Sequence, residues 1–346
     1  MDMGTRVALD AMGGDQGPAV NVEGAVAAAR ELGISVLLVG VEQELSQSLQ
    51  NHSINGLGVS ICHAPETVGM HESPSAALRK KKQSSIRVGL ELVKNGDADA
   101  FISAGNTGAV MATALITLGP LPGVERPAIA LIVPTLRGHS ILLDVGANVD
   151  CKPRHLLQFA IMGDVYARQV MGKTSPTVGL LSIGEEESKG NELTRETFKE
   201  LEEEPSINFT GNVEGREVFS GAADVIVCDG FTGNIALKIS ESAAEFFTIL
   251  LKEELAKGLV GKAGAVLARG AFERFKKRVD YSEYGGAPLL GVKGVCIISH
   301  GRSSAKAIKN AIRVAAECVE NRVVEHIRDG IAVGYRGGER CTAAGS

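Results

Sequence analysis

The sequence is poor in aromatic residues: it has no tryptophan and four tyrosines, and aromatic residues make up 4% of its 346 positions. An aromatic platform for stacked bases or sugars is therefore not expected. The six cysteines form no CxxC pair and have no zinc-type spacing. No apolar run reaches the roughly 18 residues that a membrane span needs, and no signal peptide precedes the first strand-like run. We therefore predict a cytoplasmic protein.

Several short motifs are also missing. There is no GxGxxG dinucleotide motif, no HExxH and no GxSxG. The GKT at 172–174 resembles the end of a P-loop, but Ala167 stands where the first glycine belongs. No carboxylate cluster has metal-like spacing, so we predict no metal site. The net charge of −5 argues against a non-specific nucleic-acid binder.

Short apolar runs recur along the chain and predict strands. Most are nearly continuous, as expected for strands that are covered on both faces. Helical patterns separate most of them, at about 18–32, 74–95, 106–118, 154–171, 190–203, 234–257 and 303–328. This alternation predicts an α/β fold with a mostly parallel, doubly wound sheet in three layers, α/β/α. The runs lie at 6–11, 35–40, 59–64, 99–105, 128–133, 140–146, 177–184, 224–230 and 294–301.

Six of these runs end in corners rich in Gly, Asn, Ser and Thr that lead toward a helix. Ligands of open α/β sheets bind at the carboxyl ends of the strands. The free N–H groups of helix N-termini favour anions there, and glycine lets the backbone come close to a ligand. We therefore predict one large ligand cleft along a shared edge of the sheet. The corners begin at Asp10, Ser103, Asp144, Ser182, Asp229 and Ser299.

Taken in order, the corner motifs resemble those of the bacterial acyl-ACP:phosphate acyltransferases, where ACP is acyl carrier protein. The resemblance covers about residues 6–328 and rests on LDAMGGD, SAGNTGA, LLDVGAN, GLLSIGEEESKGNE, GNVEGR, DVIVCDGFTGNIALK and EYGGAPLLGVKG with SHGRSS. It implies transfer of a fatty acyl group from acyl-ACP to inorganic phosphate, in phospholipid synthesis, without a cofactor. It also implies a homodimer in peripheral contact with the membrane, a downstream glycerol-phosphate acyltransferase that uses the acyl phosphate, and a fold similar to isocitrate and isopropylmalate dehydrogenases.

The implied chemistry needs positioned donors rather than a nucleophilic triad. Phosphate is itself an oxygen nucleophile, and a thiol with a pKa near ~8.5 leaves readily. What remains is to hold phosphate against the thioester and to stabilise the oxyanion. Lys189, which follows Glu185–Glu187 at a strand-to-helix corner, is the first catalytic candidate, and Asn234 is the second. The alternatives are a solvated charged turn for Lys189 and a helix N-cap for Asn234.

Ten further residues are expected to bind phosphate or substrate. Asp10 and Asp15 are expected to shape the cleft instead. The three glutamates either face solvent, orient Lys189 by pairing or favour helix initiation. The ten binding candidates are Gly13, Gly14, Asn106, Thr107, Gly190, Asn191, Thr232, Gly233, His300 and Ser303.

Two basic islands stand out in this acidic chain. ACP is strongly acidic, so basic patches near the cleft would steer it; a solvated helix face is the alternative for each island. The islands are Arg79, Lys80, Lys81 and Lys82, and Lys276, Lys277 and Arg278.

A helical pattern at 246–272 is interrupted by three glycines. We predict a single α/β domain of residues 1–335 with a helical excursion at about 246–285, followed by a disordered tail at 336–346. Leu255, Leu259 and Val260 of the excursion are expected to contact a membrane or a second subunit. Packing of the same apolar stripe on the sheet is the alternative.

Three rival functions remain open. A phosphate acetyltransferase-like enzyme would use acyl-CoA in place of acyl-ACP. A hydroxyacid dehydrogenase of similar fold would need NAD(P) and a divalent metal. A non-catalytic scaffold would bind ACP at the membrane and turn nothing over.

Overall fold

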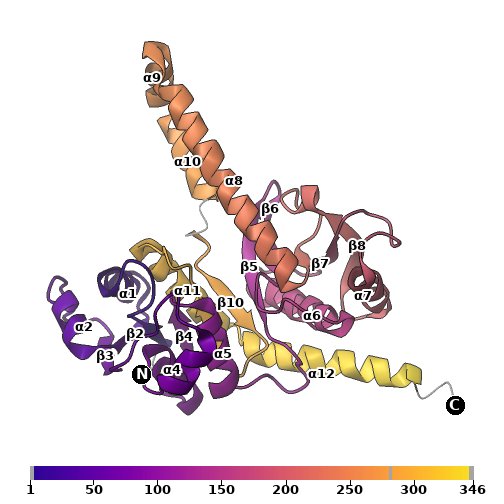
Figure 1. Cartoon of the computed structure of the whole chain (residues 1–346), viewed down its shortest axis with the longest axis horizontal. Helices are drawn as coiled ribbons and strands as arrows, with labels where there is room; N and C mark the ends of the chain where they lie inside the picture. Colours follow the sequence, from indigo (N-terminus) through magenta and orange to yellow (C-terminus); the bar gives the residue numbers. More distant parts are fainter. Residues whose placement is uncertain (1–3, 280–282, 343–346) are drawn as a thin grey trace.

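The computed structural model describes residues 4–279 and 283–342, with the backbone alone for Leu259, 276–279 and 334–342. Its strands form one 11-stranded sheet in the order β3-β2-β1-β4-β11-β10-β5-β6-β9-β7-β8 (Figure 1). The strands are β1 (Arg6–Asp10), β2 (Ser35–Gly40), β3 (Val59–His63), β4 (Ala100–Ser103), β5 (Ala128–Thr135), β6 (Gly138–Leu143), β7 (Thr177–Ser182), β8 (Asn208–Glu214), β9 (Val225–Val227), β10 (Ala287–Leu290) and β11 (Val295–Ile298). The helices are α1 (Pro18–Leu32), α2 (Glu42–Leu49), α3 (Pro74–Lys80), α4 (Ser85–Asn95), α5 (Thr107–Thr117), α6 (Pro153–Gln169), α7 (Glu192–Glu203), α8 (Gly230–Ala256), α9 (Gly258–Leu267), α10 (Arg269–Val279), α11 (Ala305–Glu320) and α12 (Val323–Thr342).

The sheet consists of two parallel blocks. In the first block, β3, β2, β1, β4 and β11 run parallel to one another. In the second block, β6, β9, β7 and β8 do the same. Between the blocks, the pairings β11–β10, β10–β5 and β5–β6 are all antiparallel. The predicted α/β architecture is confirmed, but the sheet is mixed, and its two parallel blocks run in opposite directions.

All nine predicted strands are present, and two further strands were not predicted. β8 lies at the edge of the sheet, is mostly solvent-accessible and contains Gly211 and two asparagines, so it lacks an apolar run. β10 has only four residues. Helix α2 was not predicted either. The helical patterns at 74–95 and 303–328 each divide into two helices, α3 with α4 and α11 with α12.

Most strands are apolar on both faces, as expected where helices cover both sides of the sheet. Val7 and Leu9 of β1 face a core that includes residues of α1 and α11. Ala8, between them, faces a second core that includes residues of α4 and α5. This is the two-residue alternation of a strand, here with apolar side chains on both faces. Helices α6 and α12 contribute to the same core as α1 and α11, so this layer continues under the second block.

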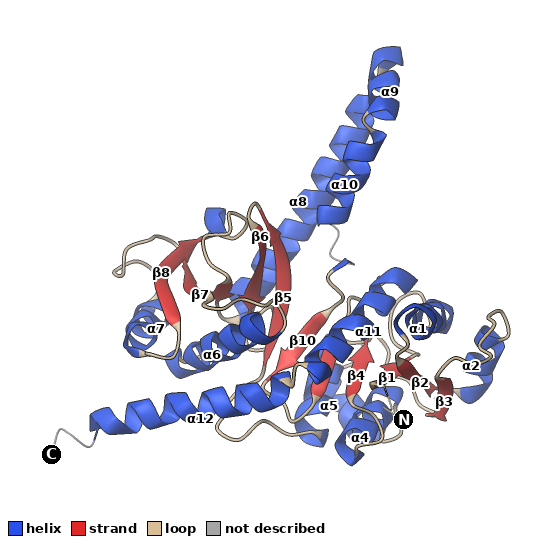
Figure 2. Ribbon diagram, turned by 180° about the vertical axis from the view of Figure 1, so that it is seen from behind, coloured by secondary structure: helices blue, strands red, loops and turns tan. Residues whose placement is uncertain are grey.

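A long helical projection leaves the body at the second block (Figures 1 and 2). Helix α8 begins at buried Gly230, α9 forms the far end, and α10 runs back alongside α8 toward the body. Val260 and Leu267 expose 88% and 89% of their surface there, whereas Leu255 is half-buried. The projection lies where the sequence predicts a helical excursion, but it starts at Gly230 rather than near residue 246. Among the described helices, none has the length and hydropathy to cross a bilayer.

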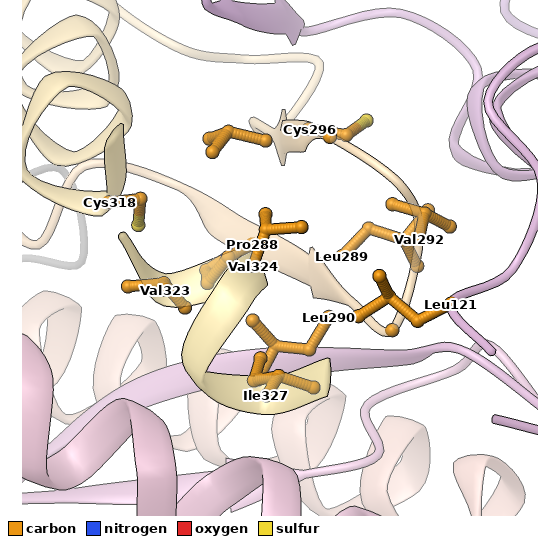
Figure 3. A pocket seen from close by; sticks show the side chains of 13 residues that line it. Leu121, Pro288, Leu289, Leu290, Val292, Cys296, Cys318, Val323, Val324 and Ile327 are labelled. Carbon is orange, nitrogen blue, oxygen red and sulfur yellow. The ribbon is translucent and has the colours of Figure 1, made fainter. Parts of the chain in front are cut away.

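The C-terminal helix α12 extends to Thr342, through residues that the sequence assigned to a tail; residues 343–346 lie outside the described part. Near its start, α12 closes a cavity of ≈ 20 Å³ against β10 and β11 (Figure 3). Its lining includes Leu290, Cys296, Cys318 and Ile327 and is apolar. A cavity of this size holds about one water molecule at most, and its apolar walls offer that water no partner.

Candidate active site

The six Gly-rich corners fall into two clusters, which lie at opposite ends of the strands of the sheet. The first corner cluster follows β1, β4 and β11 and comprises Asp10–Gly17, Ser103–Asn106 and Ser299–Ser304. The second follows β6, β7 and β9 and comprises Asp144–Asn148, Ser182–Asn191 and Cys228–Asn234. Three antiparallel pairings separate β11 from β6, so the strands of the two blocks point in opposite directions. The carboxyl ends of one block therefore lie beside the amino ends of the other. The prediction of one shared edge is therefore wrong.

A buried carboxylate organises the first corner cluster. Asp10 is 1% exposed, and its Oδ2 accepts a hydrogen bond of 2.7 Å from Ser103 Oγ. Burial raises the pKa of Asp10 above its ordinary value, while the hydrogen bond from Ser103 acts against this shift. A β-carbon on Gly13 would stand 2.7 Å from Asp10 Oδ2 and 2.7 Å from the Gly105 nitrogen. Gly13 and Asp10 thus join the β1 and β4 corners by close packing, which agrees with a shaping role for Asp10.

Asn106 is the N-cap of α5, and its side chain is fully occupied within the protein. Its Oδ1 accepts the Ala109 N–H at 3.0 Å. Its Nδ2 donates to the carbonyl oxygens of Met70 at 2.9 Å and Glu72 at 2.8 Å. The amide therefore holds the segment before α3 and has no donor left for a phosphate in this arrangement. Thr107, the next residue, is exposed.

The β11 corner is a tight turn against the β1 corner. The Asp15 N–H donates to the Gly301 carbonyl at 2.7 Å, and Gly14 has a φ of 98°. His300 is exposed, and its Nδ1 accepts the Arg302 N–H at 3.1 Å. Ser303 is buried, and Ser304 rather than Ser303 caps α11. The structure therefore brings Gly14 and His300 to one edge and directs Ser303 into the interior.

Asp144 has the corresponding place in the second corner cluster. It is fully buried, and each of its two oxygens accepts two hydrogen bonds. The donors are the N–H groups of Ile129, Ala147 and Asn148 and the side-chain amide of Asn148, at 2.7–3.1 Å. Burial raises the pKa of Asp144 above its ordinary value against the effect of these bonds. The carboxylate thus fixes the loop that leads to α6.

Asp229, and not Asn234, is the N-cap of α8. Its Oδ1 accepts the Thr232 N–H at 2.9 Å, and its Oδ2 accepts the Thr232 hydroxyl at 2.8 Å. A β-carbon on Gly233 would collide with the Asp144 carbonyl oxygen, so α8 starts directly against the β6 corner. Asn234 lies one turn into the helix, half-buried, with its carboxamide carbon 3.5 Å from where a β-carbon of Gly146 would stand. The N-cap alternative for Asn234 is therefore wrong, and its amide lies between two corners.

Lys189 stands exposed at the end of the β7 corner. Its Cγ is 2.8 Å from the position of a β-carbon on Gly184, so its stem lies over that glycine. Gly190 has a φ of 100°, and a β-carbon there would collide with Thr194 Oγ1. Asn191 caps α7 by accepting the Thr194 N–H at 2.9 Å. Because β7 and β6 both pair with β9, the corners of Lys189, Asn234 and Asp144 are neighbours.

The glutamates before Lys189 do not pair with it in the described part of the chain. Glu185 Oε1 lies 3.1 Å from Arg216 Nη2, and Arg216 Nε lies 2.7 Å from Glu214 Oε2. The Glu186 carbonyl accepts the Lys189 N–H at 3.0 Å, which closes the turn. Glu185 therefore pairs with Arg216, which it shares with Glu214, and the exposed Lys189 is left without a carboxylate partner among the described residues.

Two buried polar groups under the Lys189 corner were missed. Ser182 Oγ and Asn212 Oδ1 are buried and have no hydrogen-bond partner among the described residues. Asn212 Nδ2 donates to the Glu186 carbonyl at 3.0 Å and so holds the turn from below. Asn212 belongs to the GNVEGR motif, so this motif was the one feature of the sequence that could have pointed to it.

The thiols of this cluster are poor nucleophiles. Burial raises the pKa of Cys151 to about 12, and Asp144 and Asp229 add to the shift. Burial also raises the pKa of Cys228 well above its ordinary value. Since the thiolate is the reactive form, neither cysteine is available at neutral pH to take an acyl group.

The first basic island divides. Arg79, Lys80 and Lys82 are exposed, but Lys81 turns inward and forms an ion pair of 2.6 Å with Glu72. Its direct contact with an acidic partner is therefore not supported. The side chains of Lys276, Lys277 and Arg278 lie outside the described residues, as does that of Leu259.

Comparison with known proteins bears on this arrangement. A family model described as "Fatty acid synthesis protein" matches residues 5–326. A phosphate acyltransferase from Pelobacter propionicus is 57% identical over 93% of this chain and 93% of its own. The phosphate acyltransferase of Geobacter sulfurreducens is 57% identical over 94% and 93%.

The chain belongs to the bacterial phosphate acyltransferase family.

As a phosphate acyltransferase it is an enzyme of fatty acid and phospholipid synthesis. Its fold is shared more widely. A phosphotransacetylase from Streptococcus pyogenes is similar with a TM-score of 0.62 at 17% identity, over 92% of this chain and 95% of that one. A 4-hydroxythreonine-4-phosphate dehydrogenase from Klebsiella pneumoniae has a TM-score of 0.52 at 14% identity, over 92% and 98%. At these identities the likeness shows the fold alone.

Proposed function

We propose that this phosphate acyltransferase transfers a fatty acyl group from acyl-ACP to inorganic phosphate. A phosphate oxygen attacks the thioester carbonyl carbon and forms the new C–O bond. The C–S bond then breaks, and the phosphopantetheine thiolate leaves and takes up the proton that the phosphate loses. The products are acyl phosphate and free ACP, and no covalent enzyme intermediate is formed.

The second corner cluster carries this proposal. An exposed lysine without an ion-pair partner in the described chain lies at the same sheet edge as the amide of Asn234. Lys189 would hold the phosphate dianion, and Asn234 would donate to the oxyanion that develops on the carbonyl. The phosphate site would be lined by Gly190, Asn191, Thr232 and Gly233. The protonated thiols of the cluster support direct attack by phosphate rather than acyl transfer through a cysteine.

The test follows phosphate-dependent release of holo-ACP from long-chain acyl-ACP. We expect release to depend on phosphate and Lys189→Ala to lower kcat/KM by about 100-fold or more, because the attacking phosphate is then no longer held in position. Asn234→Ala should lower it by at least about tenfold. Release that survives Lys189→Ala but not Asn234→Ala would transfer the main role to Asn234. Absence of release with any donor would contradict the proposal.

Acyl-CoA is the second candidate donor, because the fold is shared with phosphotransacetylases. The exposed cations Arg79, Lys80 and Lys82 favour an acidic protein instead, since charges of opposite sign speed up the encounter. Comparing kcat/KM for acyl-ACP and acyl-CoA of the same chain length separates the two. A preference for acyl-CoA would contradict the ACP assignment and leave the phosphate chemistry intact.

Further parts of the proposal concern assembly and location. We expect a homodimer that touches the membrane at the far end of the helical projection, where Val260 is 88% exposed. The acyl phosphate would then pass to a membrane glycerol-phosphate acyltransferase. The kinship of this fold to isocitrate and isopropylmalate dehydrogenases also remains a proposal.

A further inference from the structure

The segment Thr67–Ser73, between β3 and α3, lies across the first corner cluster. The Met70 methyl carbon is 2.6 Å from where a β-carbon of Gly301 would stand, so the segment touches the β11 corner. On the other side, Asn106 donates to the Met70 and Glu72 carbonyls at 2.9 and 2.8 Å, so it also touches the β4 corner. One covering strip of chain thus spans two corners that come from distant parts of the sequence.

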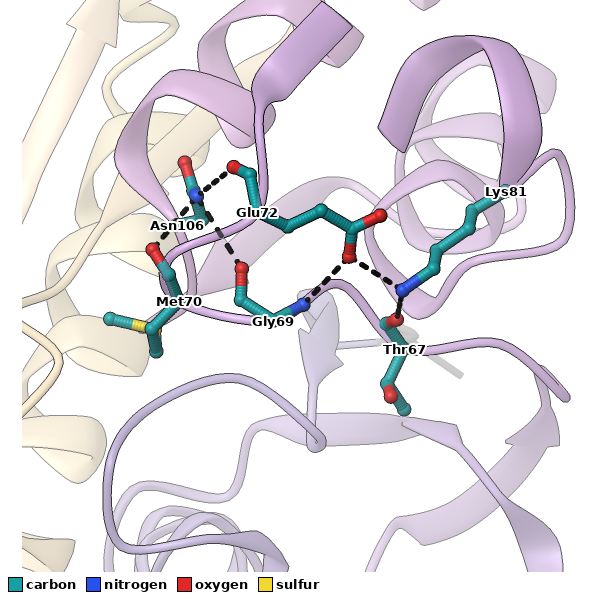
Figure 4. A network of polar contacts seen from close by, with 6 residues as sticks. All are labelled: Thr67, Gly69, Met70, Glu72, Lys81 and Asn106. Carbon is teal, nitrogen blue, oxygen red and sulfur yellow. Dashed lines mark hydrogen bonds and ion pairs between the residues drawn. The ribbon is translucent and has the colours of Figure 1, made fainter. Parts of the chain in front are cut away.

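Lys81 fastens this segment from the side of α3 (Figure 4). Its ammonium donates to the Thr67 carbonyl at 2.5 Å and to Glu72 Oε2 at 2.6 Å. The same Glu72 oxygen accepts the Gly69 N–H at 3.2 Å. The side chains of Lys81 and Glu72 are 30% and 25% exposed, so neither is freely solvated. One cation therefore ties both ends of the segment, while Asn106 ties its middle.

We propose that Lys81 is a positioning residue, which through Glu72 holds segment 67–73 closed over the first corner cluster. The contrast with its neighbours supports this role. Arg79, Lys80 and Lys82 extend into solvent, whereas the Lys81 ammonium is already shared between a carboxylate and a carbonyl. An acidic partner would have to displace both to reach it. Lys81 thus keeps the first corner cluster ordered, whereas its exposed neighbours serve the encounter with an acidic partner; the statement about the partner rests on the proposed function.

Hydrogen exchange of the backbone amides tests the fastening without any substrate. In Lys81→Met and in Glu72→Gln, we expect the amides of residues 67–72 to exchange at least tenfold faster, with the Gly69 amide most affected. Lys82→Met, on the same basic island, is the matched control and should leave this exchange unchanged. Wild-type exchange of the segment in both variants would overturn the proposal. So would faster exchange spread evenly over the sheet, because that reports lost global stability.

Kinetics with acyl-ACP separate positioning from docking. Because Lys189 and Asn234 belong to the second corner cluster, we expect Lys81→Met and Glu72→Gln to leave kcat and KM for acyl-ACP close to those of the wild type. Lys81→Arg should retain most of the slow exchange of the segment. Lys82→Met should instead raise KM, and more so at low salt. A Lys81→Met variant that behaves like Lys82→Met assigns Lys81 to docking and overturns the proposal. If the wild-type enzyme releases no ACP, the proposed function fails, and the exchange experiment still decides on the fastening.

Discussion

Single glycines determine how closely the corners of the second cluster approach one another. A side chain on Gly233 would meet the Asp144 carbonyl, and one on Gly230 would stand 2.7 Å from the Asn148 carbonyl. Gly190 adds a left-handed conformation with a φ of 100°. Conformation and space both disfavour other residues at Gly190, directly beside Lys189.

Replacing Gly190 with alanine should therefore destabilise the protein and disorder the Lys189 corner. The left-handed conformation alone costs about 1–2 kcal/mol, and the collision with Thr194 Oγ1 adds to this. Gly264→Ala is the matched control, because Gly264 lies inside α9 with open space around it and should gain about 0.5–1 kcal/mol. Urea unfolding measures both changes. Equal stability of the two variants would contradict this view of Gly190.

The raised pKa of Cys151 predicts an unreactive thiol. Its pKa is about 12, against an ordinary value of 9.0, so at pH 8 its thiolate fraction is about a thousandfold lower than in the unfolded chain. Iodoacetamide should label Cys151 of the native protein at least about 100-fold more slowly than in urea, since the thiolate is the nucleophile. Mass spectrometry of the Cys151 peptide measures both rates. Labelling at the same rate in both conditions would refute the assignment.

At the residue scale, chain order predicted part of the site. Lys189 and Asn234 each follow a strand of the second block, and the structure brings their corners together. The hydrogen-bond partners of Asn106 and Lys81 could not be predicted from the sequence, because these partners lie 9–36 residues away on a separate segment. An asparagine at a helix N-terminus has the same local pattern whether its amide faces a ligand or a loop.

At the scale of elements, the helices and most strands follow from periodicity, but strand direction does not. The runs at 128–133 and 140–146 are separated by six residues, whereas a parallel crossover needs about a dozen or more. That spacing was a usable signal for the antiparallel β5–β6 pair. β10 gave a weaker signal than the other short strands, since its four residues include Pro288, a residue that argues against a strand in the interior of a sheet. β10 and β5 stand between the two blocks, and their antiparallel pairings reverse the strand direction of the second block.

The start of α8 is set by its cap and can be tested there. Asp229→Ala removes the acceptor of the Thr232 N–H and should cost about 0.5–2 kcal/mol of stability. Asp229→Asn retains an acceptor oxygen and should cost much less. Thermal unfolding compares the two variants. A loss with Asn as large as with Ala would mean that the charge of Asp229, rather than the cap, stabilises this corner.

At the scale of the whole molecule, the helical projection separates the proposed membrane contact from the site. Val260 and Leu267 expose 88% and 89% near its far end. Val260→Asp and Leu267→Asp should weaken binding to anionic phospholipid vesicles at least about tenfold, because charge at an inserted apolar face opposes burial. Leu136→Asp, in the β5–β6 turn and 80% exposed, is the control and should bind as the wild type. Co-sedimentation measures all three, and equal binding by all would refute a membrane contact at this end.

The two parallel blocks also differ in the order in which the ribosome synthesises their strands and helices. The second block, from β6 to β8 and β9, comes from one continuous stretch of chain, residues 138–227. The first block needs β11 beside β4 and α11 against α1, so residues 1–117 wait for partners that are made after residue 290. The N-terminal third of the chain therefore spends most of translation with one sheet edge unpaired. Long delays of this kind expose a nascent chain to aggregation, so we expect this enzyme to depend on chaperones more than its size alone would imply.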